Sequence, residues 1–405
     1  MKRIIFIHYG GLIGGAPLSM LDKAEYVRNK NYDPLIIFTQ NGPIVKIAKE
    51  RNFRTKVINF KSIFFYGRHV KFRISMLLRC LVFYKNSSNL LKKLIRQEKP
   101  SICYLNTSSL LPLGFLIKKY NIPMIWSIRE APGKIKFISK WQFEKIYNLA
   151  DHVLVTSKYI LKYFKSKKKI SVLYNSIKIN DYDIDKNNSR KIIRKNFGLR
   201  KDDIVVVMLG SVQEVKGHFL LVDSAKILKK IIKDNLRFLL VSGLPSNSFN
   251  KSWKWKVKKI LSMPQSNYHR LKDYITKKKL DKYFIFSDYR TDIPQILSAC
   301  NIVVFPSLLP EGFGRPLIEG MASGKPVIST PVGPSYEIIG DNAGLVISSI
   351  DADAFANAIY KLSSDKKLCD KMGKAGKKRV SKYFNSSINN QIFIELINET
   401  LNDRL

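Results

Sequence analysis

Acidic residues are scarce in this sequence. Among 405 residues, 31 Asp and Glu stand against 71 Lys and Arg, which gives a formal net charge of +40. The scarcity is uneven, because residues 1–180 hold 8 acidic against 34 basic side chains, whereas residues 181–405 hold 23 against 37. Such a surface attracts nucleic acid, anionic membranes or acidic substrates. An AT-rich coding bias is an alternative source of part of the charge, but it does not explain the difference between the two halves.

Long apolar runs are also absent. No stretch of about 18 uncharged apolar residues occurs, so no membrane-spanning helix is predicted. Residues 1–8 begin with the charges of a signal peptide, but their apolar run is too short and is followed by paired glycines. We therefore predict that this segment forms the first strand.

Metal-binding and redox spacings are missing among the four cysteines and five histidines. A reduced, cytoplasmic protein that binds no metal ion is therefore expected. The sequence also has no recognisable nucleic-acid-binding motif and no interleaving of aromatic and basic residues, so nucleic acid is not an expected partner.

Strands and helices alternate along the chain, which predicts the α/β class. A chain of 405 residues exceeds one hydrophobic core, and near-continuous apolar strands between helices are typical of parallel sheets that are covered on both faces. The polar stretch at 180–191 is the predicted linker. The predicted strands are Ile4–His8, Pro34–Thr39, Thr55–Phe60, Ile102–Asn106, Met124–Ile128, His152–Thr156, Ile204–Leu209, Arg237–Val241, Tyr283–Phe286, Ile302–Pro306, Val327–Thr330 and Gly344–Ile347; the helices include Leu18–Lys30, Ile44–Arg51, Val70–Lys99, Trp141–Leu149 and Ile388–Leu401.

The most informative motif runs from Glu311 to Glu319, with the sequence EGFGRPLIE between an apolar strand and a helical segment. This loop follows the carboxyl end of a strand, where open α/β sheets bind ligands. Pro316 suits the first helical position. The amides of Phe313, Gly314 and Arg315 would then point toward an anion at the helix N-terminus.

Two glutamates eight positions apart, followed by the run ASGKPV at 322–327, resemble the signature of retaining glycosyltransferases of the GT-B type, family four. The resemblance implies two Rossmann-like domains whose parallel sheets face each other across a cleft. It also implies that Glu311 contacts the donor sugar and Glu319 holds the ribose hydroxyls of the nucleotide. Taken alone, Glu319 would be a favourable charge near a helix N-terminus and Glu311 a solvated residue. The surrounding strand, glycines and following run favour the functional interpretation.

A second loop, at 210–217, resembles the family's Gly-Arg and Lys-Gly pattern, in which Arg and Lys hold the donor diphosphate. Lys216 matches the pattern, although a solvated lysine is the alternative. Ser211 stands where arginine is usual, and a hydroxyl adds a hydrogen bond without charge. Stabilisation of the leaving group would therefore depend more on Lys216 and the helix amides, with Arg315 as a candidate for the missing charge.

Gly14 and Gly15 follow the first strand. Paired glycines let backbone amides approach a phosphate or sugar, although a turn alone also uses glycine. The resemblance implies that this pair faces the donor.

Arg129 stands where many family members carry histidine, at the end of a strand in the first half. An arginine stays protonated and cannot act as a base, but it can hold a hydroxyl, a carboxylate or a developing phosphate charge. The family mechanism uses the departing phosphate to take the acceptor proton, so the replacement is compatible with catalysis. A structural salt bridge to Glu130 or Glu144 is an equally good interpretation.

The basic segment 68–85 carries apolar residues on one helical face. One interpretation is an interfacial helix that rests on anionic lipid, and the other is an ordinary helix packed on the sheet. The basic loop 165–169 is interpreted as solvated and close to the same surface.

The resemblance implies a retaining, metal-independent glycosyltransferase without a cofactor, whose donor substrate is a UDP- or GDP-linked sugar. Residues 1–180, with a C-terminal helix over about 384–405 crossing back onto them, would bind the acceptor, and residues 181–383 the donor. The basic first half predicts a lipid-linked glycan acceptor, such as one on undecaprenyl diphosphate. It also predicts a peripheral location on the inner face of a bacterial membrane, as in capsule, O-antigen or lipopolysaccharide assembly.

Two alternatives remain open at the level of sequence. A sugar-nucleotide epimerase or phosphorylase can share the GT-B fold, and product formed without an added acceptor would favour it. A non-enzymic basic protein that binds nucleic acid is the other, and salt-sensitive DNA binding unaffected by nucleotide sugars would favour it. A glycoside hydrolase also uses two carboxylates, but it has no use for a diphosphate site.

Overall fold

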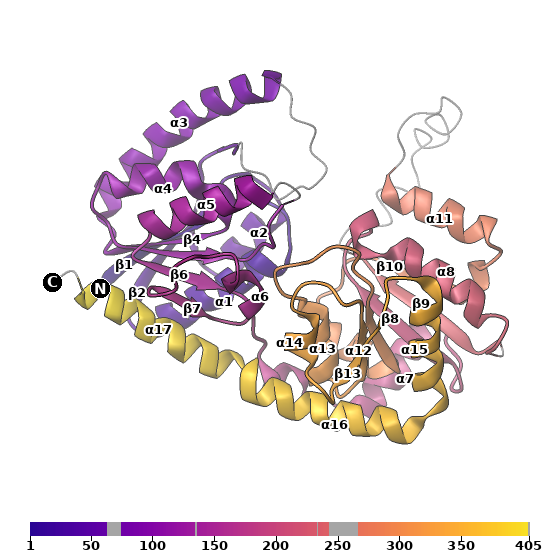
Figure 1. Cartoon of the computed structure of the whole chain (residues 1–405). Coiled ribbons are helices and arrows are strands. Elements are labelled where there is room, and N and C mark those ends of the chain that lie inside the picture. The colour runs from indigo at the N-terminus through magenta and orange to yellow at the C-terminus, as the bar shows by residue number, and fades with distance from the viewer. Residues whose placement is uncertain (63–73, 134–135, 233, 243–265, 404–405) are drawn as a thin grey trace. The chain divides into compact units, whose positions relative to one another are not determined.

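The computed structural model describes residues 1–62, 74–133, 136–232, 234–242 and 266–403, and it describes the backbone alone for residues 74–82 and 136. The chain forms two compact units (Figure 1). Unit 1 comprises Met1–Asn175 and Ser387–Leu405, and unit 2 comprises Ser176–Ser386. The predicted α/β class with two Rossmann-like parallel sheets is confirmed.

Unit 1 is built on a parallel sheet with the strand order β3-β2-β1-β4-β5-β6-β7. Its strands are β1 (Lys2–His8), β2 (Tyr32–Phe38), β3 (Arg54–Val57), β4 (Ile102–Asn106), β5 (Met124–Ile128), β6 (His152–Val155) and β7 (Ile170–Val172). Its helices are α1 (Gly15–Arg28), α2 (Pro43–Glu50), α3 (Ile74–Glu98), α4 (Leu111–Lys118), α5 (Lys136–Leu149), α6 (Lys158–Leu161) and α17 (Ser386–Asn402), with the 3-10 turn η1 (Ser108–Leu110).

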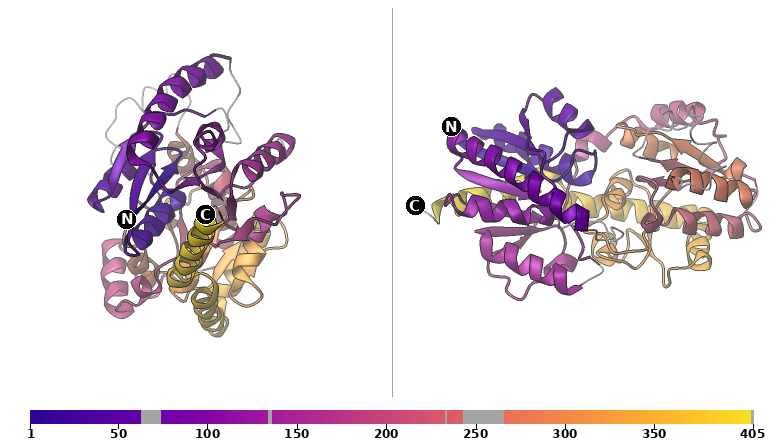
Figure 2. Two further views of the ribbon diagram at one scale, coloured as in Figure 1. Left: turned by 90° about the vertical axis from the view of Figure 1, so that its left-hand side faces the viewer. Right: turned by 90° about the horizontal axis from the view of Figure 1, so that it is seen from above.

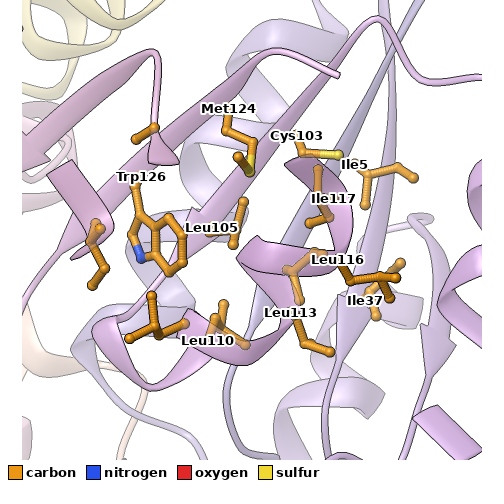
Figure 3. Close-up of a cluster of buried hydrophobic side chains, with 14 of the residues drawn as sticks. Ile5, Ile37, Cys103, Leu105, Leu110, Leu113, Leu116, Ile117, Met124 and Trp126 are labelled. Atoms are coloured by element: carbon orange, nitrogen blue, oxygen red, sulfur yellow. The ribbon is translucent and has the colours of Figure 1, made fainter. Parts of the chain in front are cut away.

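Alternate residues of the unit 1 strands enter two separate cores, because successive side chains of a strand point to opposite faces. One core lies under α3, α4 and α5 and includes Ile5, Leu105 and Trp126 (Figure 3). The other lies under α1, α2 and α17 and includes Phe6 and Tyr104. Burial on both faces explains why these strands read as continuous apolar runs.

The C-terminal helix α17 packs on unit 1. Phe393 is fully buried, and its ring lies 5.3 Å from that of Tyr104 and 6.5 Å from that of Phe6. Tyr32 Oη donates a hydrogen bond of 2.6 Å to Asn398 Oδ1. In both views of Figure 2 the yellow helix lies against the indigo and purple elements of unit 1. The last helix therefore completes one of the two cores of the first unit.

Unit 2 is built on a parallel sheet with the order β10-β9-β8-β11-β12-β13. Its strands are β8 (Ile204–Leu209), β9 (Leu236–Val241), β10 (Phe284–Ser287), β11 (Ile302–Phe305), β12 (Val327–Ser329) and β13 (Gly344–Val346). Its helices are α7 (Lys186–Asn196), α8 (His218–Leu228), α11 (Asn267–Lys277), α12 (Ile293–Ala299), α13 (Arg315–Ala322), α14 (Ser335–Ile339), α15 (Ala352–Ser364) and α16 (Lys366–Tyr383), with the 3-10 turns η2 (Ile179–Tyr182), η3 (Glu214–Lys216) and η4 (Asp281–Tyr283).

The predicted linker at 180–191 is wrong over its second half. Residues 186–196 form α7, whose N-terminus is capped by the Asp185 carboxylate accepting from the amides of Asn187 and Asn188. Ile193 and Arg194 are buried on its inner side. The polar composition therefore belongs to the exposed face of a helix in unit 2.

Segment 68–85, for which an interfacial helix and an ordinary helix packed on the sheet were the two interpretations, is described in part. Residues 68–73 lie outside the described residues, and α3 begins at Ile74. From Phe83 onward the side chains are described, and Leu91, Leu94 and Ile95 of α3 are buried in the unit 1 core.

Candidate functional site

The glycine-rich loops predicted to bind the donor meet at the carboxyl edge of the unit 2 sheet. One loop follows β8 and the other follows β11, and these strands are hydrogen-bonded neighbours. The backbone amide of Leu308 donates to Val215 O over 2.8 Å and joins the two loops. Loops at this edge of a parallel sheet form the usual ligand site of open α/β folds.

Lys216 and Glu311, 95 positions apart in sequence, form an ion pair in this site. Lys216 Nζ lies 2.6 Å from Glu311 Oε2, and both side chains are about a quarter exposed, at 27% and 26%. The other oxygen, Oε1, accepts a 2.9 Å hydrogen bond from the hydroxyl of the buried Ser307. A carboxylate with a fixed position and a cation beside it thus stand together at the sheet edge.

Gly217 allows this close approach of the two loops. It adopts φ 79°, and a Cβ at this position would lie 1.8 Å from Pro306 O. No residue with a side chain fits here without displacing the backbone that carries Glu311. Gly333, at φ 59°, packs on the other side, where a Cβ would lie 2.9 Å from Glu311 O.

Helix α13 begins at the end of the loop that carries Glu311, and Glu319 lies within this helix. Gly314 is its N-cap, with φ 131° and no side-chain cap, and Arg315 is its first residue. Pro316 is the second helical residue, so the prediction that it comes first is off by one position. The Phe313 side chain is buried and packs edge-on against Phe384, with ring centroids 5.7 Å apart. This packing fixes the loop whose amides the sequence analysis assigned to an anion.

Glu319 lies one turn into α13 and is 8% exposed. Arg315 Nε donates to its Oε1 over 2.8 Å, so the arginine that was the candidate for the missing diphosphate charge is bound to the glutamate. Tyr182, which the sequence did not single out, lies beside this pair. Burial, and then the negative charge of Glu319, raises the pKa of Tyr182 well above its ordinary value.

Ser211 follows Gly210 at the end of β8. Its Oγ accepts a 2.9 Å hydrogen bond from Gln213 Nε2. Behind this loop, burial lowers the pKa of His218 to about 4, so the ring is neutral, and its Nδ1 lies 3.3 Å from Gln213 O. The cationic group that this loop contributes to the site is therefore Lys216, as the sequence pattern predicts.

In unit 1, Gly14 caps α1 and Gly15 is its first residue. Gly14 has extended backbone angles, φ −174° and ψ 172°, and a Cβ there would meet only Pro17 Cδ at 3.8 Å. Neither backbone conformation nor crowding within the described residues therefore requires glycine at position 14.

Arg129 directly follows β5, and its Nη2 donates to Asn175 Oδ1. The two carboxylates that were its alternative partners also bind backbone amides. Glu130 Oε2 accepts from Ser108 N and Arg129 N at 3.2 Å, and Glu144 Oε1 accepts from Lys165 N at 3.1 Å.

A polar cluster lies around Arg129 at the carboxyl ends of β1, β4 and β5, and the sequence analysis named only Arg129 and Glu130 among its members. Burial lowers the pKa of His8 to about 3, helped by the charge of Arg129, and Asn106 Nδ2 lies 2.9 Å from His8 Nδ1. Burial raises the pKa of Glu130 to about 8. Thr107 has φ 147°, a strained conformation for a β-branched residue. Burial of this kind leaves no local signal in a sequence.

Three oxygen atoms of this cluster are buried and have no hydrogen-bond partner among the described residues: Asn106 Oδ1, Thr107 Oγ1 and Glu130 Oε1. Buried polar atoms normally find a partner, so this edge of the unit 1 sheet has spare hydrogen-bonding capacity.

Within the described part of the chain, no three His, Cys, Asp or Glu side chains come together as a metal-binding group. The carboxylates of Asp185 and Asp351 cap helices α7 and α15. None of the described helices combines the length and the apolar character needed to cross a bilayer.

Family models match both halves of the chain. Residues 189–379 match the model described as Glycosyl transferases group 1, and residues 13–181 match the model described as Glycosyltransferase Family 4. These ranges contain the loops of both sheet edges described above.

Full-length relatives are found among curated proteins. The chain is 22% identical over 389 residues to the UDP-Gal:alpha-D-GlcNAc-diphosphoundecaprenol alpha-1,3-galactosyltransferase of Escherichia coli, covering 90% of this chain and 89% of that protein. It is 24% identical over 408 residues to the capsular polysaccharide biosynthesis glycosyltransferase CapM of Staphylococcus aureus, covering 96% and 95%.

Solved structures share the fold. Anabaena Alr3699/HepE, solved in complex with UDP-glucose, gives a TM-score of 0.78 at 20% identity, covering 98% of this chain and 100% of that one. A glycosyltransferase from Rickettsia africae gives 0.78 at 20% identity, with 99% and 98% covered. At these identities the likeness establishes a common architecture.

Proposed function

Since the chain belongs to the group 1, family four glycosyltransferases of GT-B fold, we propose that it transfers a sugar from a nucleotide-diphosphate sugar with retention of configuration and without a metal ion. The observation that carries the proposal is the Lys216–Glu311 ion pair beside the N-terminus of α13. A cation and helix amides favour a diphosphate, and a fixed carboxylate favours sugar hydroxyls.

In the proposed complex, Lys216 and the amides of Phe313, Gly314 and Arg315 stabilise the negative charge on the departing diphosphate. Ser211 adds a neutral hydrogen bond. Glu311 is held by Ser307 and orients the sugar. Because donor binding brings a diphosphate to Lys216, the 2.6 Å ion pair of the free protein is expected to lengthen.

Glu319 is proposed to bind the ribose hydroxyls. A carboxylate offers about four lone-pair directions, so the hydrogen bond from Arg315 leaves capacity for two hydroxyl donors. Arg315 thus acts on the donor through Glu319, by fixing the orientation of its carboxylate.

The acceptor is proposed to bind unit 1, with Gly14, Gly15 and Arg129 near the transferred sugar. Arg129 cannot accept a proton at neutral pH. The acceptor hydroxyl therefore gives its proton to the departing diphosphate, and Arg129, positioned by Asn175, holds an oxygen of the sugar or phosphate.

A UDP-sugar is the proposed donor, because the names of the Escherichia coli relative and the Anabaena structure both contain a UDP-linked sugar. The same Escherichia coli name contains a diphosphoundecaprenol-linked acceptor, and CapM is named for capsular polysaccharide biosynthesis. We propose a lipid-linked glycan acceptor, a role in bacterial surface polysaccharide synthesis, and a peripheral position at the inner face of the cell membrane.

The test is a thermal-shift screen of the purified protein against UDP-, GDP-, ADP- and CMP-sugars without added metal. A ligand that binds the folded state raises its melting temperature. We expect one nucleotide class to stabilise the wild type, with the effect lost in Glu319→Ala and kept in Glu50→Ala, an exposed glutamate of unit 1. Equal stabilisation of Glu319→Ala and wild type would overturn the proposed ribose role.

Turnover separates this proposal from the alternatives. Transfer from the stabilising donor to GlcNAc-diphosphoundecaprenol, with an α-linked product, supports it. Conversion of the donor without any acceptor would instead indicate an epimerase.

A further inference from the structure

Helix α5 carries three large apolar side chains that are exposed to solvent over much of their surface. Phe137 is 79% exposed, Ile138 46% and Trp141 42%. At about 100° per residue, these three side chains lie on one side of the helix. The opposite side, with Phe143 and Ile146, is buried in the unit 1 core.

The exposure of three large apolar side chains on one side of a helix is unusual. Single exposed apolar residues are ordinary on protein surfaces, but large aromatic side chains gathered in the first two turns of one helix form a patch. α5 also lies next to α4 on the same face of the sheet, where Phe115 is 43% exposed (Figure 1).

Exposed lysines lie near these apolar side chains, both on α5 and in the neighbouring loop 165–169. Lys140 and Lys145 are exposed on α5, and Lys145 Nζ lies 6.0 Å from the centre of the Trp141 ring. The basic loop 165–169 is tied to the same helix, because Lys165 N donates to Glu144 and Ser166 Oγ lies 2.8 Å from Tyr147 Oη. Lys165, Lys167 and Lys168 of this loop are exposed.

We define the α5 face as Phe137, Ile138 and Trp141 together with Lys140, Lys145, Lys165, Lys167 and Lys168. We propose that the α5 face docks on an anionic lipid bilayer, with its aromatic side chains among the headgroups and its lysines against the lipid phosphates. Tryptophan beside apolar and basic residues suits the membrane–water interface, where one part of the surface is apolar and the other wet. The charge of the face is complementary to anionic lipids, and Glu144, the one acidic residue of α5, is engaged with the loop backbone.

This inference rests on the proposed function for its purpose, because a lipid-linked acceptor lies at a membrane surface. The docking itself requires no reaction and is measured on the protein alone. It assigns the membrane contact to an element other than segment 68–85, for which membrane contact was one of two interpretations of the sequence.

Co-sedimentation of the full chain with phosphatidylcholine vesicles, with and without phosphatidylglycerol, tests the proposal. We expect binding to depend on phosphatidylglycerol. Phe137→Ser with Trp141→Ser should weaken it about tenfold or more, by loss of buried aromatic area. Lys165→Glu, Lys167→Glu and Lys168→Glu together should weaken it mainly at low salt.

Matched variants on unit 2 provide the controls. Tyr336→Ser with Tyr360→Ser removes exposed aromatic rings, and Lys371→Glu, Lys374→Glu and Lys378→Glu together reverse three exposed lysines of α16. Both controls should bind vesicles like the wild type. Unchanged melting temperatures and an unchanged shift with the donor will show that the α5-face variants are folded and that their donor site is intact.

Trp141 gives a direct readout. Quenching of tryptophan fluorescence by brominated phosphatidylglycerol should fall in Trp141→Phe, which keeps an aromatic ring at this position. Vesicle binding by the α5-face variants equal to that of the wild type would overturn the proposal. So would lysine variants that lose binding to DNA but not to vesicles, which would indicate a nucleic-acid surface. Failure of the donor screen alone would leave the docking result unaffected.

Discussion

At the scale of single residues, the site depends on charges that are brought together from distant positions. Lys216 and Glu311 neutralise each other in the free protein, and Ser307 holds the second carboxylate oxygen. The arrangement keeps both groups ordered before a ligand arrives, which reduces the reorganisation needed on binding.

Lys216→Ala is expected to lower kcat/KM for sugar transfer about 100-fold, because a group that stabilises leaving-group charge in a partly buried site is removed. Steady-state kinetics at varied donor concentration measure the effect. Lys226→Ala, at an exposed position of α8, should match the wild type. A Lys216→Ala enzyme within about twofold of the wild type would exclude lysine from this role.

Glu130 predicts a pH-dependent stability. Its pKa is raised from 4.5 to about 8 in the folded protein, so between these values the folded state holds a proton that the unfolded state has released. The contribution of Glu130 to the free energy of unfolding therefore falls as pH rises through this window and levels off above it, whereas the lowered pKa values of His8 and His218 act in the opposite direction below about pH 6.5. Glu130→Gln removes this contribution and should be more stable than the wild type by about 2 kcal/mol at the alkaline end.

Urea denaturation from about pH 5 to pH 9 measures this difference. Glu50→Gln, at an exposed position, controls for the loss of one carboxylate. A difference between Glu130→Gln and wild type that is the same at every pH would contradict the assignment.

At the scale of elements, the sequence predicts strands better than it predicts contacts between loops. Each predicted strand appears within three residues of its expected bounds, because buried parallel strands are continuous apolar runs between helices. β7 was missed, since its three residues are only half buried. α7 was mistaken for a linker, because the exposed side of a short helix has the same polar composition as a loop.

The same contrast holds for the candidate site, because single residues could be predicted from the sequence but the contacts between them could not. Spacing and local context single out Glu311, Glu319 and Lys216 as candidates, but the Lys216–Glu311 contact spans 95 positions and depends on the packing of two loops. Burial, which gives His8 and Glu130 their shifted pKa values, comes from the assembled sheet. The exposed face of α5 was likewise hidden, because apolar residues in a helix are ordinarily assigned to the core.

Gly217 tests the packing of the two loops. Gly217→Ala must relieve a clash with Pro306 O and adopt a left-handed conformation, and we expect a loss of about 2 kcal/mol or more in unfolding free energy together with weaker donor binding. Gly198→Ala is the matched control, since its φ is 63° but no atom lies within 4 Å of its Cβ. That variant should lose about 1 kcal/mol and keep its donor affinity. Equal donor affinity in both variants would show that the contact with Pro306 does not shape the site.

At the scale of the whole molecule, the chain forms two units with separate cores. It forms most of unit 1 first, then unit 2, and its last helix belongs to unit 1 again. The excess of positive charge is concentrated in residues 1–180, and the α5 face belongs to that region. The surface suited to an anionic membrane and the edge suited to a nucleotide thus belong to different units.

Phe393 of α17 is predicted to stabilise unit 1, although it follows all of unit 2 in sequence. Phe393→Ala should lower the stability of the unit 1 core by about 3–5 kcal/mol, and Phe355→Ala should do the same for unit 2. Hydrogen exchange resolved by peptide distinguishes the two effects. Faster exchange in β8 and β9 of Phe393→Ala, with β1 and β4 unchanged, would contradict the assignment of α17 to unit 1.

Because α17 belongs to unit 1 but follows unit 2 in sequence, it also determines the order in which the two units can complete folding during synthesis. Domains usually fold as they emerge, N-terminal first. Here the first unit is synthesised with one face of its sheet still lacking the helix that carries Phe393, and that helix emerges only after unit 2 is complete. Unit 2 is therefore the first part of the nascent chain that can reach its final core, and unit 1 waits with apolar surface exposed. Apolar surface that is exposed during this interval favours aggregation, which is the hazard that chaperones counter.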